Sequence, residues 1–260
     1  MLSFSPPLDT MGLFRRKATV AEAPEPKPAK GPALNGAELA AASLGERRGG
    51  DLHDFLRVSP HRVVFGLLDV AGRLEQNRAI VMAVQQVFRS LSVELFAADE
   101  VNESDAMVEL GLQLNRTVMQ TAKGVHSCPA FAGCYDERLG TVCYFNAGHT
   151  HGLVRDRTGI SELMATGLPL GLFSHAIPDA QVVALEPGAV LLLVSRGVVE
   201  AEAGKDGNGL EPIKESLRII APNSVQSICD GVLEVVKSGV PHFNLHNDLT
   251  ALALLRKSSN

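Results

Sequence analysis

The feature of this sequence that most constrains its fold is the order in which two kinds of hydrophobic pattern follow one another. Residues 62–69 form an apolar, β-branched run that predicts a buried strand. Apolar residues at helical spacing then predict helices over residues 76–96 and 104–120, and Ser104 suits the N-cap of the second helix. Beyond residue 130 the pattern changes to short apolar runs separated by turn residues.

These short runs predict strands at residues 130–136, 141–146, 153–155, 181–185 and 190–194. Two helices at 210–220 and 224–237 and a closing strand at 249–255 are expected to follow. Strands and helices therefore do not alternate, as they would in a parallel sheet built from βαβ units. We predict an α+β fold in which an antiparallel β-sandwich is flanked by helices.

The first part of the chain differs in composition from the rest. Up to residue 32, prolines recur among alanine, glutamate and lysine. We expect residues 1–42 to form a disordered arm, because this composition supports neither a helix nor a core. Residues 43–260 are expected to form one domain, since 260 residues with 45% hydrophobic content can bury a substantial core.

Charge and cysteine content argue against several classes of protein. A net charge of -5 is unlike that of a general nucleic-acid binder, which carries a basic face. The four cysteines show no CxxC pair or zinc-finger spacing, so reduced, buried thiols are expected. The N-terminus is a poor match to a signal peptide, because Arg15, Arg16 and Lys17 follow rather than precede a long apolar stretch, and no apolar run approaches the roughly 20 residues needed to span a membrane. We therefore expect a cytoplasmic protein without a membrane span.

Two aspartates occupy positions suited to a hard metal ion. Asp51 follows a double glycine, and Asp69 ends the predicted strand at 62–69, with Gly72 three residues later. Carboxylate oxygens and a backbone carbonyl at a strand end are the ligands that Mg²⁺ and Mn²⁺ prefer. The alternative for each residue is an aspartate that caps backbone amides at the end of a loop.

Four histidines allow a second kind of metal site. His149 and His151 stand two residues apart, so on a strand they would share one face, as zinc ligands can. The alternative is that His149 belongs to a structural turn. His242 and His246 precede the closing strand, where they are either substitute metal ligands or ordinary surface residues.

Seven short motifs in a fixed order relate this sequence to a known family. They lie at residues 50–55, 69–72, 146–149, 167–171, 185–188, 197–201 and 248–250. Through them, residues 45–257 resemble PPM-type protein phosphatases of the SpoIIE-like bacterial branch. The resemblance implies a sandwich of two antiparallel sheets with two Mn²⁺ or Mg²⁺ ions at one edge, where an activated water attacks phosphoserine or phosphothreonine. It also implies a phosphoprotein partner, such as a small regulator like the anti-sigma-factor antagonists on which this branch acts.

The resemblance assigns several metal-binding positions residue by residue. Asp51 matches the acid of the family's GGD element, and Asp69 matches the shared metal ligand of its DVxG element. Val70 would offer a carbonyl oxygen, and Asp248 matches the second acid of the closing DD element. The resemblance thus implies that these four residues bind metal.

Two other metal-holding positions of the family carry different residues in this chain. Arg196 stands at the aspartate of the TDG element, and Asn247 stands at the first acid of the DD element. A guanidinium has only donors, and an asparagine brings no charge. A unit charge and a divalent ion about 4 Å apart interact by roughly 8 kcal/mol at an effective dielectric of about 20, and an arginine turns this attraction into repulsion.

We therefore expect Asp51, Asp69 and Arg196 at the centre of the catalytic site, with a weakened or lost metal site. Our hypothesis is that Arg196 acts as a built-in cation that pairs with Asp69 and also with Asp51. The alternative is that Arg196 points into solvent and leaves an incomplete metal site.

Three functions follow from these observations. The favoured one is a signalling pseudophosphatase that binds a phosphoprotein regulator with little or no turnover. The second is an active phosphatase that uses Mn²⁺ or Mg²⁺ with the remaining acids, Asp51, Asp54, Asp69 and Asp248. The third, of another class, is a protein-interaction module that binds through its outer helices. The expected cofactor is Mn²⁺ or Mg²⁺, or none.

Overall fold

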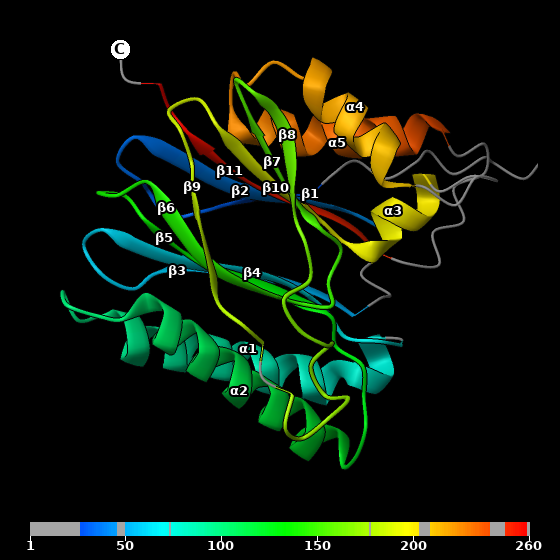
Figure 1. Ribbon diagram of the computed structural model, residues 1–260. Coiled ribbons are helices and arrows are strands. Elements are labelled where there is room, and N and C mark those ends of the chain that lie inside the picture. Colours follow the sequence, from blue (N-terminus) through cyan, green and yellow to red (C-terminus); the bar gives the residue numbers. More distant parts are fainter. Residues whose placement is uncertain are drawn as a thin grey trace, which may run out of the picture.

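The computed structural model describes residues 27–45, 50–72, 74–176, 178–202, 209–239 and 248–258. Two antiparallel sheets lie face to face, and helices cover the outer face of each sheet (Figure 1). A third apolar cluster fills the space between the sheets. The predicted α+β sandwich flanked by helices is therefore confirmed.

One sheet contains five strands. In spatial order they are β3 (Asp51–Arg57), β4 (Arg62–Asp69), β5 (Ala130–Asp136), β6 (Thr141–Ala147) and β9 (Gln181–Ala184). Along β4, Val64 and Leu68 contact the helical layer, whereas Phe65 and Leu67 lie between the two sheets. Because side chains alternate between faces and both faces of β4 are covered, this strand is apolar at nearly every position.

Helices α1 (Leu74–Phe96) and α2 (Glu103–Ala122) cover this five-stranded sheet. Asn102, and not the predicted Ser104, is the N-cap of α2: its side chain accepts hydrogen bonds from the backbone N–H groups of Ser104 and Asp105 at 3.1 and 3.3 Å. The prediction failed because several residues at this helix start have capping side chains. Within the described ranges, the segment Asn77–Phe96 of α1 is long and apolar enough for a membrane span, by length and composition alone. In the fold, one side of α1 packs against α2 and the sheet.

The other sheet contains six strands. In spatial order they are β1 (Lys27–Lys30), β2 (Ala37–Leu44), β11 (Leu249–Arg256), β10 (Val190–Val194), β7 (Gly152–Asp156) and β8 (Gly159–Leu163). Its outer face carries α4 (Leu210–Ile219) and α5 (Val225–Gly239), and the short helix α3 (Arg196–Glu202) follows β10 directly (Figure 1).

The predicted disordered arm is wrong in its last part. Strand β1 lies inside residues 1–42, and β2 begins inside this range, continues to Leu44 and pairs with β11 along its whole length. On β2, Ala40 and Ala42 face the helical layer, whereas Leu39 and Ala41 face the other sheet. Most of these side chains are alanines, so the strand carries a weak hydrophobic pattern although it is buried. Residues 1–26 lie outside the described part of the chain.

Candidate functional site

The ends of strands from both sheets meet at one edge of the sandwich. Strand β3 begins there with Asp51, and β4 ends there with Asp69. From the other sheet, β10 leads into Arg196, and Asp248 immediately precedes β11. The fold thus brings four residues of the predicted site to one edge, although they are far apart in the sequence.

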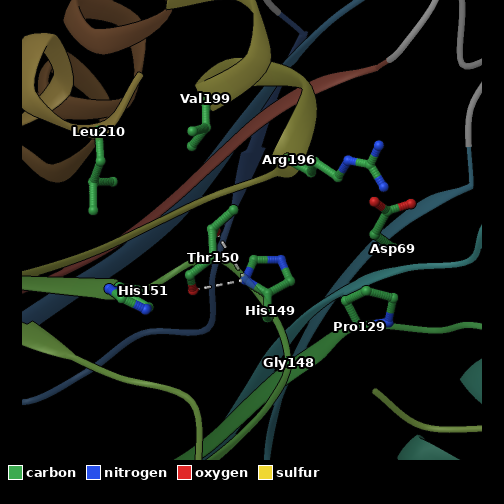
Figure 2. A pocket seen from close by; sticks show the side chains of 9 residues that line it. All are labelled: Asp69, Pro129, Gly148, His149, Thr150, His151, Arg196, Val199 and Leu210. Atoms are coloured by element: carbon green, nitrogen blue, oxygen red, sulfur yellow. Dashed lines mark hydrogen bonds between the residues drawn. The ribbon is translucent and has the colours of Figure 1, made fainter. Parts of the chain in front are cut away.

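Two neighbouring hollows occupy this edge. The first, which we call the acidic cavity, has a volume of about 180 Å³, and its lining includes Asp51, Asp69 and Arg196. The second, which we call the histidine pocket, has a volume of about 310 Å³ and shares Asp69 and Arg196 with the first. Its remaining walls include His149, Thr150, Val199 and Leu210 (Figure 2).

The two aspartates of the acidic cavity face each other across antiparallel strands. Asp51 and Asp69 are register partners, so their side chains lie on the same face of the sheet. Burial raises the pKa of Asp51 to about 8, and the negative charge of Asp69 adds to the rise. Burial also raises the pKa of Asp69, while the Arg196 guanidinium opposes that rise and the Glu200 and Asp248 carboxylates add to it. Without a bound cation, Asp51 is therefore mostly protonated at neutral pH.

A hydroxyl network that the sequence did not reveal connects Asp51 to the other sheet. Thr250 of β11 donates its Oγ1–H to Asp51 Oδ2 at 2.8 Å. Ser195 accepts a hydrogen bond from the Thr250 backbone N–H at 3.0 Å and donates to the backbone oxygen of Asp248 at 3.3 Å. Thr250 lies within the motif at residues 248–250, and Ser195 directly follows β10 and precedes Arg196, which is the signal that could have identified them. The network fixes Asp51 at the junction of the two sheets.

A close backbone approach explains the glycine before Asp51. A Cβ atom on Gly50 would lie 1.8 Å from the backbone oxygen of Val70, so a larger residue would push the two chains apart. Val70 itself is fully buried. The Val70 carbonyl therefore faces the start of β3, beside the two aspartates.

Arg196 is the first residue of α3, and its side chain is 66% exposed. Its Nε donates to Glu200 Oε1 at 2.6 Å, one turn along the same helix. Figure 2 shows its guanidinium turned toward the Asp69 carboxylate, and its positive charge opposes the rise in pKa that burial causes at that carboxyl. The predicted pairing of Arg196 with both aspartates is therefore corrected. Arg196 forms its ion pair with Glu200, and its charge acts on Asp69. Asp51 accepts a hydrogen bond from Thr250 instead.

Asp54, which we considered as a substitute metal ligand, lies on the other side of β3. Its carboxylate accepts hydrogen bonds from Arg89 at 2.5 and 2.6 Å and from Gln85 at 3.1 Å, both on α1. Because side chains alternate along a strand, residues three apart point to opposite faces. Asp54 therefore anchors α1 and does not join Asp51 in the acidic cavity.

His149 and His151 have separate roles. His149 is buried in a tight turn, where its backbone N–H donates to Asn146 Oδ1 at 2.8 Å. His151 Nδ1 lies 2.6 Å from Glu162 Oε2 near the surface. The histidines thus do not form a shared pair of zinc ligands, and the alternative of a turn role describes His149.

The side chains at this edge determine whether a metal ion fits there. Across the described ranges, no three His, Cys, Asp or Glu side chains are grouped closely enough to hold one. The lining of the acidic cavity includes the carboxylates of Asp51 and Asp69 and the guanidinium of Arg196. Asn247, His242 and His246 lie outside the described residues. The described side chains therefore do not fit the metal pair that the resemblance implies.

Comparison with known proteins relates the chain to one family. A family model described as Stage II sporulation protein E (SpoIIE) matches residues 59–257. Phosphoserine phosphatase RsbP of Bacillus subtilis (strain 168) is 26% identical over 155 residues, which are 59% of this chain and 37% of RsbP. The chain thus spans little more than a third of that relative.

Two solved structures share the fold. The RsbU and RsbW domains of Rv1364c from Mycobacterium tuberculosis superpose with a TM-score of 0.72 at 22% identity, over 89% of this chain and 64% of that chain. The PP2C phosphatase domain of SpoIIE from Bacillus subtilis, solved with a fragment of its regulatory domain, gives 0.69 at 14% identity, over 87% and 64%. Since the family model covers most of the sequence, the chain belongs to the SpoIIE family of PPM-type serine/threonine protein phosphatases.

Proposed function

We propose that this chain is a phosphoprotein-binding member of its family whose metal-dependent turnover is weak or absent. The observation that carries the proposal is Arg196, whose positive charge lies beside Asp69 at the mouth of the acidic cavity. A divalent cation bound by Asp69 would meet this charge at short range, and repulsion would offset the attraction of the remaining carboxylates.

The state of Asp51 supports the same proposal. A carboxyl whose pKa is raised to about 8 holds its proton at neutral pH, and a metal ion would have to displace that proton. The same guanidinium that opposes a cation suits a phosphoryl group, because arginine binds phosphate oxygens through charge-assisted hydrogen bonds. Binding of a phosphorylated residue is therefore favoured where binding of a metal pair is not.

The proposed partner is a phosphoserine-containing regulatory protein. This part of the proposal is supported by family membership and by the phosphoserine phosphatase RsbP, which matches part of the chain. We place the partner's phosphorylated residue at the edge where Arg196 lies, since both hollows open beside this side chain.

Calorimetric titration of the purified protein with Mn²⁺, together with turnover of phosphoserine peptides, tests the proposal. We expect no micromolar Mn²⁺ binding by the wild type and no metal-dependent turnover. The double variant Arg196→Asp, Asn247→Asp restores the two acids and is expected to gain both. Arg196→Met with Asn247→Asp is the matched control, because it removes the positive charge without adding a carboxylate at position 196. Metal-dependent turnover by the wild type would establish an active phosphatase and overturn the proposal.

A further inference from the structure

The histidine pocket contains a hydrogen-bond acceptor that lacks a donor. His149 is 4% exposed, and its Nε2 is buried without a hydrogen-bond partner among the described residues. Figure 2 shows this nitrogen on the side of the ring that faces Arg196 and Asp69, away from the bonds made by Nδ1. A buried polar atom without a partner costs free energy, so the pocket favours a ligand that supplies the missing donor.

The contacts of the other ring nitrogen determine which nitrogen carries the proton. Nδ1 lies 3.2 Å from the backbone oxygen of Thr150 and 3.1 Å from Thr150 Oγ1. The backbone oxygen can only accept, and the hydroxyl donates its single hydrogen to the Val194 backbone oxygen. Nδ1 must therefore be the donor to both, and burial lowers the pKa of His149 to about 4, so the ring is neutral. Nε2 then carries a lone pair and no proton.

This assignment excludes one simple occupant and favours another. A phosphoryl group near neutral pH is mainly a dianion that offers acceptors, so phosphate alone cannot satisfy Nε2. A peptide N–H is a donor that every phosphoprotein carries close to its phosphorylated side chain. The same pocket places the Arg196 guanidinium near the lone pair and offers the apolar side chains of Val199 and Leu210.

We infer that the histidine pocket binds one phosphorylated residue of a protein chain, with its phosphoryl group at Arg196 and a backbone N–H donated to His149 Nε2. This inference rests on the proposed function and adds a recognition residue to it. His149 recognises a backbone N–H group, which free phosphate lacks. The rigid turn at Asn146 and the bonds to Thr150 hold the ring in the orientation that presents Nε2.

A set of small probes tests the inference directly. The parent probe is N-acetyl-O-phosphoserine N-methylamide, and two analogues each carry a methyl group on one of its two amide nitrogens. Binding to the full chain is measured by NMR titration in the presence of a metal chelator. We expect one analogue to bind about five- to tenfold more weakly than the parent, which is the effect of one lost hydrogen bond. Inorganic phosphate is the control, because it lacks an N–H.

The variant His149→Asn completes the test. An asparagine amide can replace the Nδ1–H donor toward Thr150 but has no atom at the position of Nε2. The variant is expected to bind the parent probe about five- to tenfold more weakly than the wild type, to bind parent and analogue equally, and to leave phosphate binding unchanged. The comparison of probes on the wild type remains decisive if the variant folds poorly.

The outcomes separate the inference from the proposed function. If phosphate and the parent bind but neither methyl group weakens binding, or if the penalty persists in His149→Asn, the inference is overturned while the proposed function stands. If neither phosphate nor the parent binds and Arg196→Met behaves like the wild type, the proposed recognition of phosphoryl groups at this edge fails as well. Zn²⁺ binding that disappears in His149→Asn, without any effect of amide methylation, would show that Nε2 is a metal ligand and would also overturn the inference.

Discussion

The side chain of Arg196 interacts with two carboxylates, one exposed and one partly buried. Arg196 forms a surface ion pair with Glu200 along α3, and its charge also reaches the partly buried Asp69. The exposed pair contributes little to stability, since surface ion pairs are worth about 0–1 kcal/mol. The effect on Asp69 matters more for the proposed function, because it keeps positive charge beside a carboxylate that the resemblance implies to be a metal ligand.

Asp51 gives the protein a dependence of stability on pH. Its pKa is about 8 in the folded chain, against about 3.9 for an aspartate in an unfolded chain. A raised folded-state pKa gives a contribution that is fully present below about pH 4 and is lost as the pH rises toward 8. We expect the free energy of unfolding of metal-free protein to fall by on the order of 3 kcal/mol between about pH 5 and about pH 8, and Asp51→Asn to remove most of this fall.

Urea unfolding followed by circular dichroism at several pH values measures this effect as the difference between wild type and variant. Glu94→Gln, at an exposed position of α1, is the control and should keep the wild-type slope. If the free energy of unfolding depends on pH in the same way in wild type and Asp51→Asn, Asp51 is ionised in the folded protein and the prediction is contradicted.

The hydroxyl of Thr250 is expected to stabilise the junction between the sheets. Thr250→Val keeps the shape of this 1% exposed side chain but removes the donor to Asp51. We expect a loss of about 1–2 kcal/mol in the free energy of unfolding at neutral pH, measured by chemical denaturation. Thr141→Val on β6 is the matched control, since its hydroxyl makes no hydrogen bond within the described ranges. Equal losses in the two variants would mean that valine in a strand, and not the lost bond, causes the effect.

At the scale of elements, strands buried on both faces were the easiest to predict. The bounds of β4, β5 and β10 agree with the predicted runs, because nearly every position of such a strand is apolar. Strand β3 was not predicted: it carries Asp51, His53 and Asp54, whose polarity hides its pattern. Among the described residues, the hydrogen bonds to the buried carboxylate of Asp54 come from α1 and from the adjacent backbone, which a local pattern does not reveal.

The bond between α1 and β3 leads to a prediction about the helical layer. Arg89→Met leaves the Asp54 carboxylate, whose side chain is 6% exposed, without its charged partner. The expected loss is about 2 kcal/mol, less than for a fully buried pair because the Arg89 side chain is 55% exposed. Thermal and urea unfolding measure the loss. Arg78→Met, an exposed position on the same helix, should change stability by less than about 0.5 kcal/mol, and a similar loss there would contradict the assigned role of Arg89.

At the scale of the whole molecule, the fold is two helix-covered sheets that share one apolar layer and meet at the edge that holds the candidate site. Sheet order places the first described strands beside the last strand of the chain, since β2 pairs with β11. Strand β2 therefore pairs with the strand that follows Asp248, and that strand pairs in turn with β10, which leads to Arg196.

This arrangement predicts how far the chain can be shortened. A protein that begins at residue 27 contains every described element, so we expect it to fold. Its melting temperature should agree with that of the full chain within about 2 °C, since one degree corresponds to only a fraction of a kcal/mol. A protein that begins at residue 45 lacks β1 and β2, exposing an edge of β11 and the apolar face of α5. We expect it to be insoluble or to unfold non-cooperatively. Soluble yield and calorimetry distinguish the two cases. Cooperative unfolding of the shorter chain would show that the folded domain begins near residue 42 and would contradict the prediction.

The sequence by itself determined the fold class and the positions to examine. The order of strand-like and helix-like patterns predicted the sandwich, and short motifs led to Asp51, Asp69 and Arg196, which line one cavity. The metal-binding and catalytic roles of these residues stay predictions. Such features are local: period, turn residues and short spacings are properties of neighbouring positions in the chain.

Only the tertiary structure decided which partners these residues have. It put Asp54 on the face opposite Asp51, where Arg89 of α1 binds it, and brought Thr250 from the other sheet to Asp51. It also placed the alanines of β2 in the core, where Ala40 and Ala42 pack against the helical layer and Ala37 and Ala41 pack against the other sheet. The physical reason is that these contacts join segments far apart in sequence, so strand pairing and layer packing, and not local pattern, set them.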